Sequence, residues 1–202
     1  MHAEPPLRAG SDIVRVARGL GRLLRFDARW AEGFDFSMRG FLQSFYGPLL
    51  ALPFYVFFIA MVQSTQASGR GLSAVVLGAA AAEHLLDAFG YILIIGLISR
   101  PLRIGAGFSA FSVVVNWSSL FLNAPLAVAS LLLMGGEDGL EVFRWFALLL
   151  FCSSVYIVWR AARETLTREI APLALMVVLS VAWSAAADQV VGWVVGRAAS
   201  GL

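Results

Sequence analysis

Five long apolar stretches occupy most of this chain, over about residues 41–62, 72–98, 104–134, 142–159 and 170–191. An α-helix needs about 20 apolar residues to cross the hydrocarbon core of a bilayer. Inside lipid the backbone must satisfy its hydrogen bonds within the segment, so each stretch is expected to be helical. The sequence therefore predicts an all-α, polytopic membrane helix bundle with about five transmembrane helices.

The composition also indicates that much of the protein surface faces lipid instead of water. The chain is 59% hydrophobic and 14% charged, whereas soluble domains carry about 25% charged residues. The net charge of +2 is too small to indicate a nucleic-acid partner. Cys152, the only cysteine, lies in the fourth stretch and is expected to be a small buried hydrophobe. The first forty residues hold no long apolar run before a cleavage site, so no cleavable signal peptide is expected.

All fifteen basic residues are arginines, and they are spread unevenly around the apolar stretches. Positive charge near the ends of membrane helices is retained on the cytoplasmic side. With five spans the count is twelve to three in favour of a cytoplasmic N-terminus and a periplasmic C-terminus. The arginine-only, alanine-rich composition indicates a bacterial inner membrane. The inner set is Arg8, Arg15, Arg18, Arg22, Arg25, Arg29, Arg39, Arg100, Arg103, Arg160, Arg163 and Arg168, and the outer set is Arg70, Arg144 and Arg197.

Residues 1–40 are expected to form a cytoplasmic arm, followed by the transmembrane bundle over 41–202. Within the arm, Ser11 to Trp30 has helical periodicity that separates an arginine face from an apolar face. Such a helix suits the membrane surface and its anionic headgroups. Alternatively, its apolar face docks on the protein's own cytoplasmic ends or on a partner. Gly19 and Gly21 are the places where it could break. The arginine face comprises Arg15, Arg18, Arg22, Arg25 and Arg29, and the apolar face Ile13, Val16, Leu20, Leu23, Leu24 and Trp30.

Polar residues recur inside three of the apolar stretches. An ionisable group at the bilayer centre costs about 3 kcal/mol or more, so it normally faces a bundle interior or water. Helical spacing places the polar residues of each stretch on one stripe, which predicts a polar interior shared by three helices. The stripes are Glu83, Asp87 and Tyr91, with His84 beside them; Ser109, Ser112, Asn116, Ser119 and Asn123; and Ser180, Ser184 and Asp188.

Three interpretations of this polar interior stay open. The groups could form interhelical hydrogen bonds worth about 0.6 kcal/mol each. They could form a proton- or ion-coupled path, as acidic and histidine chains do in transporters. Thirdly, Leu72 to Ala82 could lie on the membrane surface, with the crossing helix starting at Glu83. A zinc site needs three or four protein ligands, and His2 is the only histidine besides His84. Neither a metal nor a cofactor is therefore expected.

Two further features concern the outer ends of the helices. Arg144 and Asp188 lie near the outer ends of the fourth and fifth stretches, where an ion pair would relieve the desolvation of both. Gly135 to Glu141 is acidic and glycine-rich, as an outer loop would be. The third stretch is longer than one span needs and contains Pro125, which predicts either a kinked helix or a span followed by an interfacial helix.

Two short motifs, together with the five-span plan, resemble the Yip1 family of small membrane proteins. Tyr46-Gly47-Pro48 is similar to the YGP part of that family's DLYGP motif, although Ser44-Phe45 replaces its Asp-Leu. Gly90-Tyr91 is similar to its GY motif. The resemblance implies a non-enzymatic membrane protein that works through partners or through the organisation of the bilayer.

No nucleophile elbow, P-loop or dinucleotide-binding fingerprint is present, so an enzyme is not expected. The sequence favours a scaffold, a membrane-organising protein or an accessory subunit of a larger complex. Its expected partners are membrane lipids, with anionic headgroups at the N-terminal helix, and other membrane proteins or further copies of itself. The alternative is a small proton- or ion-coupled transporter or channel component that uses the polar interior.

Overall fold

The computed structural model describes residues 9–65 and 73–200, with side chains described for 12–65 and 73–193, and all of its regular structure is helical. Arg8 and Arg70, which contribute to the charge count, lie outside the described residues, as does the side chain of Arg197. The elements are α1 (Ala9–Leu24), η1 (Ala28–Gly33), α2 (Met38–Ser44), α3 (Tyr46–Thr65), α4 (Ala74–Ser99), η2 (Gly105–Gly107), α5 (Phe108–Ser130), η3 (Leu131–Gly135), α6 (Gly136–Thr165) and α7 (Ile170–Ser200).

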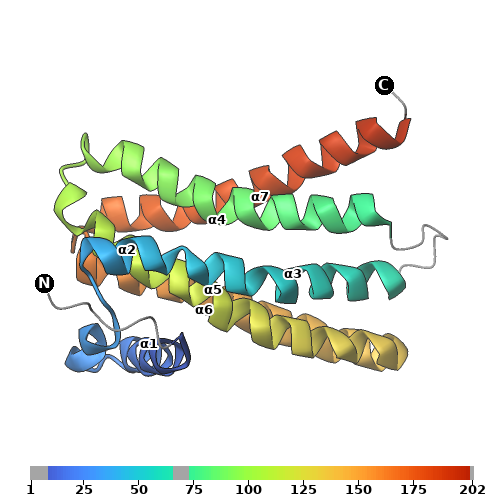
Figure 1. Ribbon diagram of the computed structural model, residues 1–202, viewed down its shortest axis with the longest axis horizontal. Helices are drawn as coiled ribbons and strands as arrows, with labels where there is room; N and C mark the ends of the chain where they lie inside the picture. Colours follow the sequence, from blue (N-terminus) through green and yellow to red (C-terminus); the bar gives the residue numbers. More distant parts are fainter. Residues whose placement is uncertain (1–8, 66–72, 201–202) are drawn as a thin grey trace, which may run out of the picture.

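The long helices lie side by side, and successive ones run in opposite directions (Figure 1). Helices α3, α5 and α7 run away from the end of the bundle that carries α1, and α4 and α6 return to it. The chain is a multi-pass membrane protein by helix length and hydropathy. Four helical stretches are long and apolar enough to cross a membrane: Met38–Thr65, Ala74–Ser99, Gly105–Thr165 and Ile170–Trp193.

The third of these stretches is 61 residues long and contains both α5 and α6. As one straight helix it would extend about 90 Å, roughly three times the thickness of the hydrocarbon core. Instead the chain turns back at Gly136, whose φ of 70° falls in the left-handed region. Helices α5 and α6 then pack along one another.

The turn at Gly136 corrects two sequence predictions. The segment from Gly135 to Glu141 is not an outer loop, because all but its first residue belongs to the first turns of α6. Glu137 and Asp138 fall in that first turn, where negative charge stabilises the positive end of the helix dipole. The fourth helix therefore has 30 residues and extends beyond 142–159 at both ends. Pro125 is accommodated inside α5, which continues to Ser130 before the short helix η3.

Helix α4 is continuous over 26 residues, so the interpretation that places Leu72 to Ala82 on the membrane surface is wrong. The Ser73 side chain caps the helix by accepting a hydrogen bond from the backbone N–H of Val76. Glu83 consequently lies in the interior of a single long helix.

The predicted helix from Ser11 to Trp30 ends early, at Leu24. Phe26 adopts a φ of 61°, which a helix cannot accommodate, and Asp27 then caps the separate helix η1. Gly19 and Gly21, the expected weak points, remain helical. A Cβ on Gly33 would overlap the backbone of Gly19, so η1 packs directly on α1.

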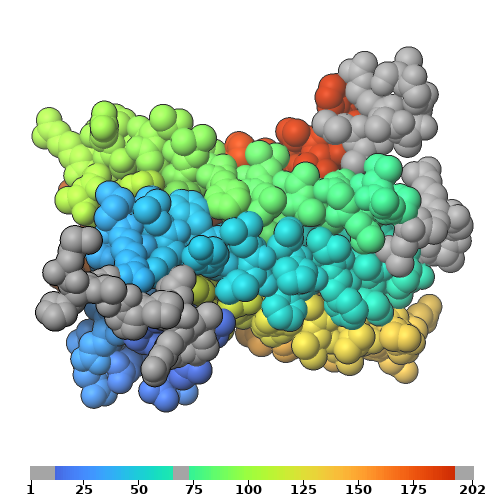
Figure 2. Space-filling model, viewed as in Figure 1, coloured from blue at the N-terminus to red at the C-terminus, as the bar shows by residue number. Residues whose placement is uncertain are grey.

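The apolar face of α1 docks on the protein itself. Val16, Leu20 and Leu23 are almost completely buried and join the main hydrophobic core. Helix α1 lies across the flank of the bundle near one end, and its layer is confined to that end (Figures 1 and 2). Of the two predictions for this helix, the structure therefore agrees with docking of the apolar face on the protein itself and not with its insertion into lipid.

Candidate functional site

A cavity of about 420 Å³ lies among α3, α4, α5, α6 and α7. Its lining combines apolar side chains with polar groups from all five of these helices. The predicted residues His84, Asp87, Tyr91, Asn116, Ser119 and Asn123 all line it, as do Ser180 and Ser184. Glu83 is absent from the lining. The structure therefore brings part of each predicted polar stripe to one place, whereas Ser109, Ser112 and Asp188 also lie outside the lining. Helix α6 contributes Ser154 to the same cavity.

Asp87 is the acidic residue of the cavity wall. Ser184 of α7 lies in the same wall and is a polar neighbour of its carboxylate. No ion pair joins Asp87 to an arginine in the part of the chain with described side chains. An acidic group that faces a cavity without a cationic neighbour is a candidate for holding a proton or a cation.

Glu83 lies one helical turn from Asp87 but is held by a different partner. Its Oε1 accepts a hydrogen bond from the Tyr55 hydroxyl of α3 at 2.7 Å. The Asp188 carboxylate on α7 lies close enough to Glu83 to interact with it electrostatically. Three polar side chains therefore lie near one another here: Tyr55 of α3, Glu83 of α4 and Asp188 of α7.

His84 is almost fully buried, with 6% of its surface exposed. Its Nε2 lies 3.0 Å from the carbonyl oxygen of Pro48. A carbonyl oxygen can only accept a hydrogen bond, so Nε2 carries the proton in this arrangement. The imidazole also stacks on the Tyr55 ring, with 5.0 Å between the ring centroids. His84 thus connects α4 to α3.

Other polar side chains of the cavity bind backbone or hydroxyl groups. Asn116 Nδ2 donates to Ser44 Oγ at 2.9 Å, and Tyr91 donates from α4 to the Met176 carbonyl of α7 at 3.1 Å. Asn123 Nδ2 donates to the Ser119 carbonyl within α5. The Asn116 and Tyr91 bonds join different helices, as polar side chains commonly do inside membranes, whereas the Asn123 bond stays within α5.

The sequence predictions omitted three residues of this region: Tyr55, Ser44 and Trp183. Trp183 Nε1 donates to the backbone carbonyls of Leu86 and Asp87 at 3.2 and 3.1 Å. The available signal for Tyr55 was its position as the only tyrosine in the apolar run over residues 47–62 of the first stretch. Ser44 and Trp183 gave no comparable signal, because their partners lie 72 and 96 or 97 residues away.

The predicted ion pair between Arg144 and Asp188 is not among the ion pairs of the described side chains. Both residues are exposed. The first half of α6 packs near η3, whereas the second half of α7 leans away from α6 beside α4 (Figure 1). Asp188 instead lies within electrostatic range of Glu83 on α4.

The five predicted lipid-surface arginines do not share one helical face. Arg25 and Arg29 lie beyond the end of α1, where the chain has already turned. Arg29 binds Asp27 at 3.1 Å, and this hydrogen bond holds the pKa of Asp27 below its usual range. Arg15 pairs with Asp12 at 3.3 Å and Arg22 with Glu32 at 2.7 Å, while Arg18 and Arg25 are exposed. Contact of these arginines with lipid headgroups stays a prediction.

Arg160, an arginine of the predicted inner set, is buried rather than free in a loop, with 5% of its surface exposed. It donates to Glu164 at 2.6 Å, and its guanidinium lies 4.4 Å from the centre of the Phe26 ring. A guanidinium over an aromatic face is stabilised by the ring quadrupole. The C-terminal end of α6 is therefore attached to the segment that follows α1.

No group of three His, Cys, Asp or Glu side chains within the described ranges is placed to hold a metal ion. Cys152 is exposed on α6 rather than buried as expected, because an apolar side chain of a membrane helix can face lipid as readily as the protein core. The known proteins offer no direct guide to function, since no family model, curated protein or solved structure matches this chain. The resemblance to the Yip1 family accordingly stays a prediction.

Proposed function

We propose that this chain is a non-enzymatic protein of a bacterial inner membrane that binds a proton or a small cation in its central cavity and acts as a transporter or channel component. The cavity of about 420 Å³, with Asp87 in its wall, is the observation that carries this proposal. Ionisable groups inside membrane bundles commonly mark ion pathways and proton relays.

The neighbours of Asp87 support a cation rather than an anion. Glu83 interacts electrostatically with Asp87, and Asp188 with Glu83, so three carboxylates follow one another between α4 and α7. Hydroxyl and amide oxygens of Ser119, Asn123 and Ser184 also belong to residues that line the cavity. Oxygen ligands of this kind suit hard monovalent cations and protons.

The proposal includes five crossings, with the N-terminus inside and the C-terminus outside. The alternation of α3 to α7 in Figure 1 supports five crossings, since α5 and α6 run in opposite directions. With five crossings Arg100, Arg103 and Arg163 lie at the same end as α1, which agrees with retention of positive charge on the inner side.

Ion flux in vesicles of the purified, reconstituted protein tests the proposal. Wild-type protein should dissipate an imposed proton or sodium gradient, and Asp87→Asn should lower the rate at least about tenfold because the carboxylate of the cavity wall is lost. Glu169→Gln, at an exposed position outside the long helices, is the matched control and should match the wild type. Equal flux through wild type, Asp87→Asn and empty vesicles would refute the proposal.

A scaffold or accessory-subunit role is the second candidate, favoured by the second half of α7. This half leans away from α6 (Figure 1), and Asp188, Val190 and Trp193 on different sides of it are exposed. Exposed polar and aromatic side chains on a membrane helix can pair with a helix of another protein. Purification from native membranes in mild detergent should then yield a stoichiometric partner that Asp188→Leu loses and Asp87→Asn retains.

A further inference from the structure

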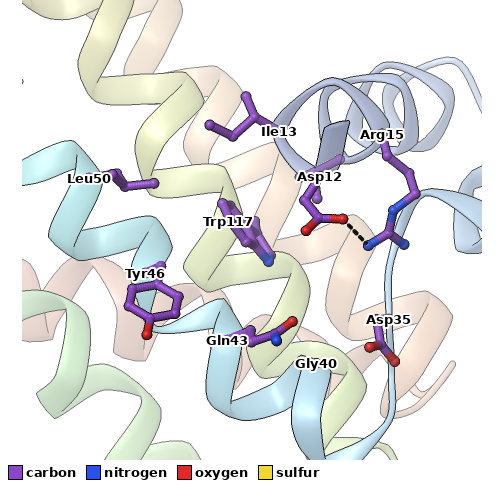
Figure 3. Close-up of a pocket in the computed structure, with 10 residues that line it drawn as sticks. Asp12, Ile13, Arg15, Asp35, Gly40, Gln43, Tyr46, Leu50 and Trp117 are labelled. Carbon is purple, nitrogen blue, oxygen red and sulfur yellow. Dashed lines mark hydrogen bonds and ion pairs between the residues drawn. The ribbon is translucent and has the colours of Figure 1, made fainter. Parts of the chain in front are cut away.

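A second hollow, of about 220 Å³, lies between α1 and α3 on the flank of the bundle (Figure 3). Helix α1 supplies one wall and α3 the opposite wall, with a tryptophan of α5 between them. The walls comprise Asp12, Ile13 and Arg15 on α1, Tyr46 and Leu50 on α3, and Trp117 on α5.

The end of the hollow nearest α1 and the 34–37 loop is charged. Arg15 binds the Asp12 carboxylate at 3.3 Å, and its guanidinium points toward Asp35 (Figure 3). The backbone N–H of Ser37 donates to Asp35 at 2.9 Å, which holds the pKa of Asp35 below its usual range. Asp35 is therefore ionised at neutral pH, and the three lining side chains present two negative charges and one positive charge. The Arg39 guanidinium, which is not part of the lining, also acts electrostatically on Asp35.

The other end of the hollow is apolar and lies deeper in the bundle. Tyr46 and Leu50 belong to the candidate membrane span that starts at Met38, so they lie about 12 to 18 Å along it. Asp12 and Asp35 precede that span in the chain. A ligand that fills this hollow must combine a charged group at the membrane surface with an apolar part that reaches into the hydrocarbon region.

We infer that this hollow binds one zwitterionic phospholipid of the phosphatidylethanolamine class. The lipid phosphate meets Arg15, its ammonium group meets Asp35 and Asp12, and one acyl chain passes between Leu50 and Trp117. In the lining itself two carboxylates stand against one guanidinium, which favours a headgroup that carries a positive charge over a purely anionic headgroup. The inference is independent of the central cavity, because it concerns α1 and a different face of α3.

The full-length protein in nanodiscs with equal amounts of phosphatidylethanolamine and phosphatidylglycerol tests this site. Native mass spectrometry should show one tightly retained lipid, and that lipid should be phosphatidylethanolamine. Asp35→Asn should lower its retention roughly tenfold, the loss expected when one charge-assisted hydrogen bond is removed. Arg18→Gln is the matched control, since Arg18 is exposed on the same helix and does not line the hollow.

A second variant separates loss of the ligand from loss of the fold. Leu50→Trp should fill the apolar end and exclude the acyl chain, while the partial exposure of Leu50 allows the larger side chain. It should lose phosphatidylethanolamine and keep the hydrogen-exchange protection of α1. Equal retention of the two lipids by the wild type, retention of neither, or unchanged phosphatidylethanolamine in both Asp35→Asn and Leu50→Trp would overturn the inference.

Discussion

Tyr55 shows how one side chain can tie together groups that are far apart in the sequence. Its hydroxyl donates to Glu83, 28 residues away, and its ring stacks on His84. Outside the membrane, water would donate hydrogen bonds to the Glu83 carboxylate. Inside the membrane the Tyr55 hydroxyl replaces one of these donors. Tyr55 is therefore expected to stabilise the contact between α3 and α4.

Tyr55→Phe removes only the hydroxyl and should lower the free energy of unfolding by about 1 to 2 kcal/mol, because a partly buried acceptor loses its donor. Thermal unfolding in detergent measures the effect. Tyr46→Phe is the control, since Tyr46 is half exposed, and it should leave stability within about 0.5 kcal/mol of the wild type. An equal effect of the two substitutions would show that the bond to Glu83 contributes nothing.

The helices of this bundle approach closely where glycine removes a side chain. Gly47 on α3 faces α5, and a Cβ there would overlap the backbone of Asn116. Gly90 on α4 similarly accommodates the Trp183 ring of α7. Small residues let membrane helices pack backbone to backbone, where dispersion and hydrogen bonds must replace the hydrophobic effect.

Gly47→Ala should force α3 away from α5 and cost about 1 to 3 kcal/mol, the usual penalty of overpacking. Gly78→Ala is the matched control, since nothing lies within 4 Å of a Cβ at Gly78 and alanine favours the helix. Unfolding in detergent should rank Gly78→Ala at or above the wild type and Gly47→Ala well below it. The reverse order would contradict the close packing of α3 on α5.

The docking of α1 can be tested with two adjacent leucines. Leu23 is fully buried in the main core, whereas Leu24 is 38% exposed. Leu23→Ala should cost about 2 to 5 kcal/mol through the cavity it creates, and Leu24→Ala should cost far less. Hydrogen exchange over residues 12–24 should therefore quicken only in Leu23→Ala. If α1 instead inserted Leu24 into lipid, the two variants would lose protection to a similar extent.

The number of crossings decides on which side of the membrane the connection between α6 and α7 lies. In a Cys152→Ser background, Asp138→Cys should react with a membrane-impermeant maleimide in intact spheroplasts. Glu169→Cys should react only after permeabilisation, because five crossings return the chain to the inside between α6 and α7. Both native residues are exposed. Reaction of Glu169→Cys from outside would mean that residues 105–165 cross the membrane once.

Helical class and membrane affinity were predictable because they follow from local composition and from the length of the apolar stretches. The polar stripes were predictable for the same reason, since helical spacing fixes which residues share a face. The hydrogen-bond partners of these polar residues were less predictable, because they are distant in the sequence. Tyr55 binds Glu83 across 28 residues, and Ser44 binds Asn116 across 72 residues. The predicted start of the fourth helix was wrong because a segment rich in glycine and acidic residues is compatible both with a loop and with the first turn of a helix.

Chain composition and periodicity alone establish a multi-pass helical membrane protein. Two outcomes needed the packed structure. The apolar face of α1 met the core through Val16 and Leu23, although its amphipathic pattern fits lipid equally well, because the spacing of apolar residues along a helix does not specify which apolar surface covers them. Asp188 lies within electrostatic range of Glu83 rather than in an ion pair with Arg144, because the tilt of α7 depends on side-chain packing along its whole length and not on depth in the membrane.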